Sequence, residues 1–201
     1  MLAAELAARV RPSSPVVLAL PRGGVPVAAE VAAALSAPLG VILVRKLGVP
    51  GHRELAMGAL AMIGDEVSLV RNADVIRDLG ISDSAFEAVQ AGELAELQRR
   101  RTALGGTAPA VTNAEVIVVD DGLATGSTML AAVSALRPKA PAKIIAAIPV
   151  ASRSAVQSVS AVADLVVCPA MPVPFFAVGA AYKDFSQLSD DQVQAILERY
   201  S

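Results

Sequence analysis

Short runs of valine and isoleucine alternate with alanine-rich stretches along much of this 201-residue chain. Apolar runs of this length indicate strands buried on both faces, and the alanine-rich stretches between them are typical of connecting helices. The alternation predicts an α/β fold with a mostly parallel central sheet flanked by helices. We expect strands at residues 16–20, 40–44, 116–120, 143–149 and 164–167, most of them linked by helices at residues 25–35, 127–136 and 152–159.

The alternation stops between residues 45 and 114. Residues 57–70 read as a hairpin that turns at Gly64-Asp65, and residues 73–79 as a short helix. Ser82 is the expected cap of a long helix that runs to about Arg101. Because this insertion is too ordered for a linker and too polar for a core, we expect an arm or lid at the C-terminal edge of the sheet, where open α/β folds bind ligands.

Composition excludes several classes of protein. The net charge is −2, so no general positive field attracts nucleic acid or anionic lipid. Mean hydropathy is +0.56, but the longest apolar stretch, residues 144–151, contains Pro149 and is far shorter than the ~20 residues of a membrane span. A single cysteine, Cys168, cannot form an internal disulfide. We expect a soluble, cytoplasmic protein with no nucleic-acid or membrane partner.

The strongest motif is Val-Ile-Val-Val-Asp-Asp-Gly-Leu-Ala-Thr-Gly-Ser-Thr at residues 116–128. An apolar strand ends at Asp120 and Asp121, and a loop of small residues then opens a helix. Backbone N–H groups, hydroxyls and a helix N-terminus form a phosphate cradle, which a larger side chain at Gly126 would crowd. The two carboxylates can accept hydrogen bonds from vicinal hydroxyls or metal-bound water. A plain Asp-Asp-Gly turn is the alternative, and it leaves the Ala-Thr-Gly-Ser-Thr run unexplained.

A second motif, Leu-Ala-Leu-Pro-Arg-Gly-Gly-Val-Pro at residues 18–26, also places a strand before a helix. Gly23 and Gly24 let the backbone approach a diphosphate, and Arg22 supplies a forked donor. By itself this motif is equally consistent with a tight turn. Its pairing with the acidic strand favours an anion site.

The acidic segment resembles the signature of type I phosphoribosyltransferases, and Arg22-Gly23-Gly24 resembles their pyrophosphate-binding loop, especially the Ser-Arg-Gly-Gly form of xanthine-guanine enzymes. The resemblance implies the type I phosphoribosyltransferase fold and transfer of a 5-phosphoribosyl group from phosphoribosyl pyrophosphate (PRPP) to a nitrogenous acceptor, a nucleobase or related heterocycle. It also implies a cis peptide at Pro21-Arg22 or Arg22-Gly23. The residues that would bind PRPP are Gly23, Gly24, Asp120, Asp121, Gly122, Ala124, Thr125, Gly126, Ser127 and Thr128.

A third segment, residues 44–54, resembles the mobile catalytic loop of adenine enzymes and, offset by one residue, that of orotate enzymes. The implied catalytic set is Arg22, Arg45, Lys46, Asp120 and Asp121. By the same resemblance Asp120 and Asp121 would hold Mg²⁺ through water or substrate. His52 reads as a solvent-facing loop residue, and the run at residues 99–101 as a solvated helix end that a lid could bring to the phosphates.

Near the C-terminus, residues 175–185 loosely resemble the hood of hypoxanthine-guanine enzymes. The comparison implies that Phe176 stacks on the acceptor and that Asp184 is its acidic partner. Packing of a small satellite core is the alternative reason for the aromatic cluster. The resulting expectation is one domain, residues 1–201, with a core at about 16–44 and 114–168, an arm or lid at 45–113 and a hood at 169–188, which dimerises as is usual in the family.

Two other functions remain open on the sequence. A regulatory protein could keep the phosphate cradle to sense PRPP or a nucleotide without turnover, although the intact set of Arg22, Asp120, Asp121, Arg45 and Lys46 favours an enzyme. A dinucleotide-dependent oxidoreductase is disfavoured because no Gly-x-Gly-x-x-Gly motif is present. The sequence contains no Gly-x-Ser-x-Gly nucleophile elbow, so it does not support a covalent role for Ser127.

Overall fold

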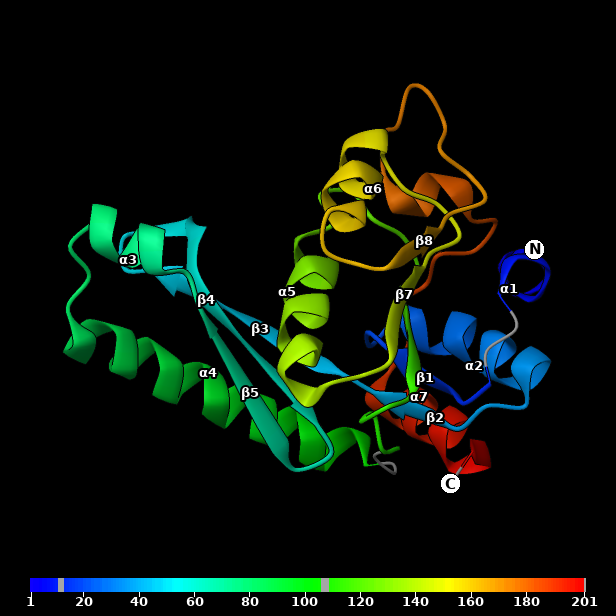
Figure 1. The fold of residues 1–201 in the computed structure, drawn as a ribbon, viewed down its shortest axis with the longest axis horizontal. Helices are drawn as coiled ribbons and strands as arrows, with labels where there is room; N and C mark the ends of the chain where they lie inside the picture. The colour runs from blue at the N-terminus through cyan, green and yellow to red at the C-terminus, as the bar shows by residue number, and fades with distance from the viewer. Residues whose placement is uncertain (11–12, 106–108, 201) are drawn as a thin grey trace.

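The central sheet of the molecule is parallel, in the order β2-β1-β6-β7-β8 (Figure 1). The computed structural model describes residues 1–10, 13–105 and 109–200. Val16 of β1 pairs with Val116 of β6, which pairs with Ile144 of β7, so the two sequence motifs leave the sheet at the same edge. The strands are β1 (Pro15–Ala19), β2 (Leu39–Val41), β6 (Glu115–Val119), β7 (Lys143–Ala147) and β8 (Leu165–Val167).

Helices cover both faces of this sheet, as the apolar strands predict. Alternate residues of β6 serve different faces: Ile117 and Val119 belong to one core cluster, with residues of α1 and α2, and Val116 and Val118 to another, with residues of α5 and α6. The predicted α/β fold is therefore confirmed. The helices are α1 (Leu2–Arg9), α2 (Gly24–Leu35), α5 (Ser127–Leu136), α6 (Arg153–Ser160) and α7 (Asp190–Leu197), with short 3-10 turns η1 (Arg137–Lys139), η2 (Val178–Ala181) and η3 (Glu198–Tyr200).

The insertion forms a three-stranded antiparallel sheet and two helices, which extend away from the central sheet (Figure 1). The predicted turn at Gly64-Asp65 is confirmed, and Ser82 caps the long helix by accepting the Ala85 N–H. The elements are β3 (Leu43–Val49), β4 (His52–Ile63), β5 (Glu66–Arg71), α3 (Ala73–Asp78) and α4 (Asp83–Leu104).

Two expectations about this insertion are wrong. The strand predicted at residues 40–44 is divided at Ile42, where the chain leaves β2 and enters β3 of the second sheet. The loop predicted at residues 44–54 is instead β3, a turn at Pro50-Gly51 and the start of β4. Leu47 and Val49 are buried beside exposed Lys46, so alternation along β3 holds these residues in a strand.

The insertion also contributes more to the core than its polar sequence suggests. Phe86, Leu97 and Leu104 of α4 are buried and belong to the same core cluster as the α1 and α2 face of the central sheet.

No helix in the described ranges is long and apolar enough to cross a membrane. The peptide between Pro21 and Arg22 is cis, one of the two positions expected, and a second cis bond precedes Pro174.

Candidate active site

The two glycines of the Arg-Gly-Gly turn pack directly against the acidic end of β6. A Cβ at Gly23 would overlap the Asp121 carboxylate, and one at Gly24 would lie 2.7 Å from the Val119 carbonyl oxygen. Only glycine allows this approach, because any side chain would push the turn away from the strand end. Parallel pairing of β1 with β6 therefore brings the two motifs into a single site.

Asp120 and Asp121 have different surroundings. The Asp120 carboxylate turns back and accepts the Asp121 N–H at 2.9 Å. Burial and the neighbouring Asp121 charge raise the pKa of Asp120 to about 8, and burial also raises the pKa of Asp121. The pair therefore retains a proton at neutral pH, and a bound cation could take the place of that proton.

The loop after the acidic pair lies against its neighbours on both sides. Gly126 has φ +76°, and a Cβ there would lie 3.2 Å from Val159 of α6. A Cβ at Gly122 would lie 2.5 Å from Val178 Cγ1, and the Ala124 carbonyl accepts the Ser152 hydroxyl at 2.7 Å. Both glycines are thus required by contacts behind the loop, which leaves its hydroxyl side open.

Hydroxyls at the start of α5 form a small network. Thr125 Oγ1 lies 3.1 Å from Ser127 Oγ, and Lys46 Nζ donates to the same Ser127 oxygen at 3.3 Å. Thr128 follows on α5 and lines a cavity of about 720 Å³ together with Arg45 and Lys46. The last residue of the predicted phosphate loop and the cations of β3 therefore share one cavity.

Arg45 and Lys46 nevertheless differ in their partners. Arg45 forms a part-buried ion pair with Glu93 of α4, whereas exposed Lys46 faces the hydroxyls of α5. Of these two predicted leaving-group cations, Lys46 is directed at the loop. His52 is exposed at the start of β4, and the side chains of Arg53 and Glu54 lie outside the described part of the chain.

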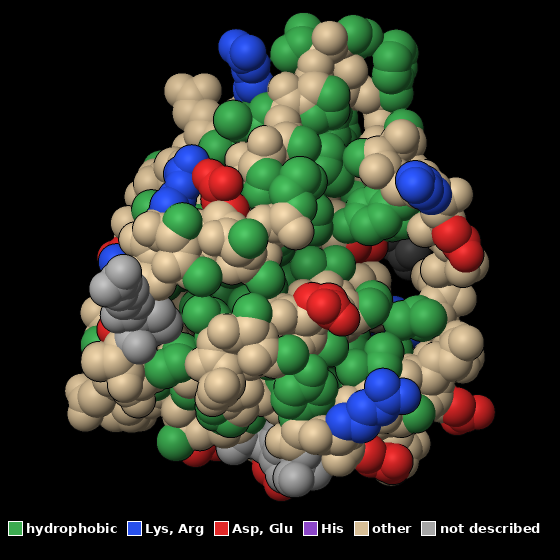
Figure 2. Space-filling view, turned by 90° about the vertical axis from the view of Figure 1, so that its right-hand side faces the viewer, with side chains coloured by type: hydrophobic (Ala, Val, Ile, Leu, Met, Phe, Trp, Pro, Cys, Tyr) green, Lys and Arg blue, Asp and Glu red, His purple; other side chains and the backbone are tan. Residues whose placement is uncertain are grey.

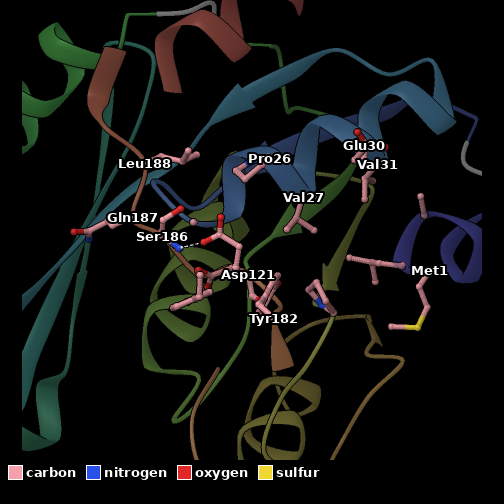
Figure 3. A pocket seen from close by; sticks show the side chains of 16 residues that line it. Met1, Pro26, Val27, Glu30, Val31, Asp121, Tyr182, Ser186, Gln187 and Leu188 are labelled. Atoms are coloured by element: carbon pink, nitrogen blue, oxygen red, sulfur yellow. Dashed lines mark hydrogen bonds between the residues drawn. The ribbon is translucent and has the colours of Figure 1, made fainter. Parts of the chain in front are cut away.

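A cavity of about 750 Å³ lies beside Asp121 (Figure 3). Asp184 lines it and accepts the Ser186 N–H at 2.9 Å. Tyr182 also lines it and donates its hydroxyl to the Asp121 backbone carbonyl. Burial and the charges of Asp121 and Asp120 raise the pKa of Tyr182 to about 12, so the phenol stays neutral.

Phe176 does not occupy the position expected of it. Its side chain is 84% exposed and is not part of this cavity's lining. Tyr182 and Phe185 line the cavity instead, with ring centroids 5.2 Å apart. The aromatic cluster in the sequence was the signal for these two residues, but it did not reveal which rings turn inward.

Arg22 lines a separate cavity of about 260 Å³ with Arg99 and Arg100 of α4. Asp190 of α7 lies 3.9 Å from Arg22, and Glu96 forms ion pairs with both α4 arginines. Hydrogen bonds from these two arginines lower the pKa of Glu96 to about 2. The C-terminal end of α4, which the sequence predicts to be solvated, thus faces the Arg-Gly-Gly turn across a polar cavity.

The donor set at the acidic pair suits Mg²⁺ that is held mainly by a substrate and water. Two adjacent carboxylates with raised pKa provide oxygen ligands and would be stabilised by a cation. Within residues 1–10, 13–105 and 109–200, His, Cys, Asp and Glu form no group of three that could hold a metal ion. Asp120 and Asp121 would therefore bind the ion jointly with its ligand.

The chain belongs to the phosphoribosyltransferase family: the family model described as Phosphoribosyl transferase domain matches residues 1–184. A Mycobacterium tuberculosis (strain H37Rv) protein, provisionally named a phosphoribosyl transferase, is 46% identical over 98% of this chain. The chain spans only 44% of that relative's length. The chain in the crystal structure of TT1426 from Thermus thermophilus has 40% sequence identity to this chain. The two structures match with a TM-score of 0.86 over 100% of this chain and 94% of that one.

Proposed function

We propose that this protein transfers the 5-phosphoribosyl group of PRPP to a nitrogenous acceptor, a nucleobase or related heterocycle, and releases pyrophosphate. The observation that carries the proposal is the contact of the Gly23-Gly24 turn with Asp120 and Asp121. This contact supports the proposal because it brings the Arg-Gly-Gly turn together with the carboxylate pair and the loop that follows the pair. A ligand with a phosphate, two vicinal hydroxyls and a diphosphate fits this combination.

Each group then has a defined task. The loop from Gly122 to Thr128 holds the 5-phosphate through backbone N–H groups and hydroxyls, and Asp121 binds the ribose hydroxyls. Arg22 and Lys46 balance the charge that develops on departing pyrophosphate, while the carboxylates offset positive charge on the ribose ring. When bound, Mg²⁺ supplies charge neutralisation at the diphosphate, held through Asp120 and Asp121. No protein nucleophile is required.

Calorimetry with PRPP and Mg²⁺ tests the proposal. The double variant Asp120→Asn, Asp121→Asn should weaken binding at least about 100-fold, because the pair can no longer supply negative charge to Mg²⁺. A variant with the same change at two exposed aspartates of α3, Asp74→Asn and Asp78→Asn, is the matched control. Unchanged affinity in the first variant would remove the site assignment.

Pyrophosphate release across a panel of bases tests turnover separately. Release that depends on an added base supports the transferase, and tight PRPP binding without release by any base would favour a sensor of PRPP. We further propose a cytoplasmic homodimer and a single domain whose arm is residues 45–113 and whose hood is residues 169–188. Light scattering of the purified protein tests the dimer.

A further inference from the structure

We propose that the acceptor of this site carries no anionic group, presents N–H donors toward Asp121 and Asp184, and extends as an apolar body toward α1. The inference rests on the proposed function, because it assigns the 750 Å³ cavity to the acceptor. It goes further in naming the chemical class that the cavity accepts.

Charge gives the first argument. Among the described residues that line the cavity, the charged side chains are the carboxylates of Glu30, Asp121 and Asp184, and the Met1 residue with its α-ammonium lies at the far end from Asp121. Arg22 belongs to a different cavity, and Lys46 points to the hydroxyl of Ser127. An anionic acceptor would lie among like charges without a cationic side chain to offset them, whereas N–H groups would find carboxylate acceptors.

Shape gives the second argument. Figure 3 shows Pro26, Val27 and Val31 of α2 on one side of the cavity, Asp121 and Tyr182 across from them, and Met1 at the far end. Asp121, Tyr182 and Ser186 thus gather at one end, whereas the α2 and α1 side of the cavity is mainly apolar, with Glu30 beside Val31 as its carboxylate. Figure 2 shows hydrophobic side chains gathered through the middle of the face that lies at the right of Figure 1.

Size gives the third argument. A cavity of about 750 Å³ lies in the range that holds a drug-sized ligand, and a lone nucleobase would fill a small part of it. An apolar substituent on the base would cover Met1, Pro26 and Val27, whose side chains are exposed or half-buried, and remove their surface from water. The acceptor class is therefore a neutral amino-heterocycle with an apolar substituent.

Equilibrium binding of four probes tests the proposal on the whole protein. N6-benzyladenine should bind at least about tenfold more tightly than adenine, and adenine at least about tenfold more tightly than orotate or nicotinate. The variant Val27→Lys should reverse the order, because it places a cation in the cavity. Leu188→Lys serves the same purpose from the 182–188 segment if Val27→Lys does not fold.

The matched control is Val67→Lys, because Val67 is 42% exposed on β5 and outside the cavity lining. It should leave the order of the probes unchanged. Tighter binding of orotate or nicotinate than of adenine to the unmodified protein would overturn the proposal, as would binding of no probe. PRPP binding, measured in parallel, distinguishes the two proposals. Absence of PRPP binding contradicts the proposed function, whereas PRPP binding together with a reversed probe order in the unmodified protein contradicts this inference alone.

Discussion

The two sheets of this molecule position chemistry in different ways. Strands of the central sheet are short and almost wholly buried, and their functional groups lie just beyond the strand ends, as Asp120 and Asp121 do after β6. In the antiparallel sheet the cations Arg45 and Lys46 lie within β3 itself, where neighbouring side chains point to opposite faces. Groups just beyond the strand ends therefore come together from different motifs. Neighbouring residues within one strand are instead directed to opposite faces of the sheet.

The largest effect is expected where the central sheet brings its two motifs together. Gly23→Ala should reduce PRPP affinity at least about 100-fold, because the new methyl group overlaps the Asp121 carboxylate, so that either the carboxylate or the turn must move. Isothermal calorimetry measures the change. Gly92→Ala in α4 is the control for an added methyl group without overlap: Gly92 lines the cavity of Arg45 and Lys46, but a Cβ there meets nothing within 4 Å, and the change should stabilise the helix by about 0.5–1 kcal/mol. Equal affinity of both variants would contradict the close-approach argument.

A smaller effect should separate the two cations of β3. Lys46→Gln should lower the rate of pyrophosphate release about tenfold with little change in stability, because Lys46 is exposed and faces Ser127. Arg45→Gln should instead lower the free energy of unfolding by about 1–3 kcal/mol, because it leaves Glu93 without its charged partner.

Steady-state kinetics and urea unfolding of the two variants make this comparison. Lys46→Arg keeps the charge and should recover part of the rate. If Arg45→Gln affected the rate more than Lys46→Gln at unchanged stability, the assignment of the two roles would be reversed.

The smallest effect is a pH dependence of stability. Because the pKa of Asp120 is raised to about 8, the folded protein holds a proton between about pH 4 and pH 8 that the unfolded chain has released. Stability therefore falls as pH rises through this window, and the loss is complete above it. Asp120→Asn removes the titrating group. Between pH 5 and pH 9 the melting temperature of this variant should therefore fall by a few degrees less than that of the unmodified protein. The exposed Asp65→Asn variant should follow the unmodified protein.

The sequence predicted most of what depends on local pattern. The parallel sheet, the helices on both of its faces, the turn at Gly64-Asp65 and the Ser82 cap follow from apolar runs and capping residues that lie close together in the chain. The two phosphate-site motifs could be recognised because each is a continuous segment. Their juxtaposition was implied only through the family resemblance, since it depends on pairing between β1 and β6.

The errors arose where distant residues decide the local structure. Residues 44–54 contain Gly48, Pro50 and Gly51, which favour a loop, but Arg45 and Lys46 pair with Leu60 and Ala59 of β4 and become strand. The choice of inward ring had the same origin. Tyr182 lines the cavity with its hydroxyl on the distant Asp121 carbonyl, and Phe185 lies against the Tyr182 ring, contacts that the local sequence does not indicate.

The hydroxyl network at the start of α5 determines where affinity for a phosphate can come from. Ser127 already accepts a hydrogen bond from Lys46 and lies within hydrogen-bond distance of Thr125, so an arriving oxyanion exchanges one partner for another at these atoms. Such an exchange contributes little net free energy. Discrimination in favour of a doubly charged phosphoester over a neutral sugar alcohol must then reside in the ammonium of Lys46 and in the peptide dipoles of α5, and added salt should erode it.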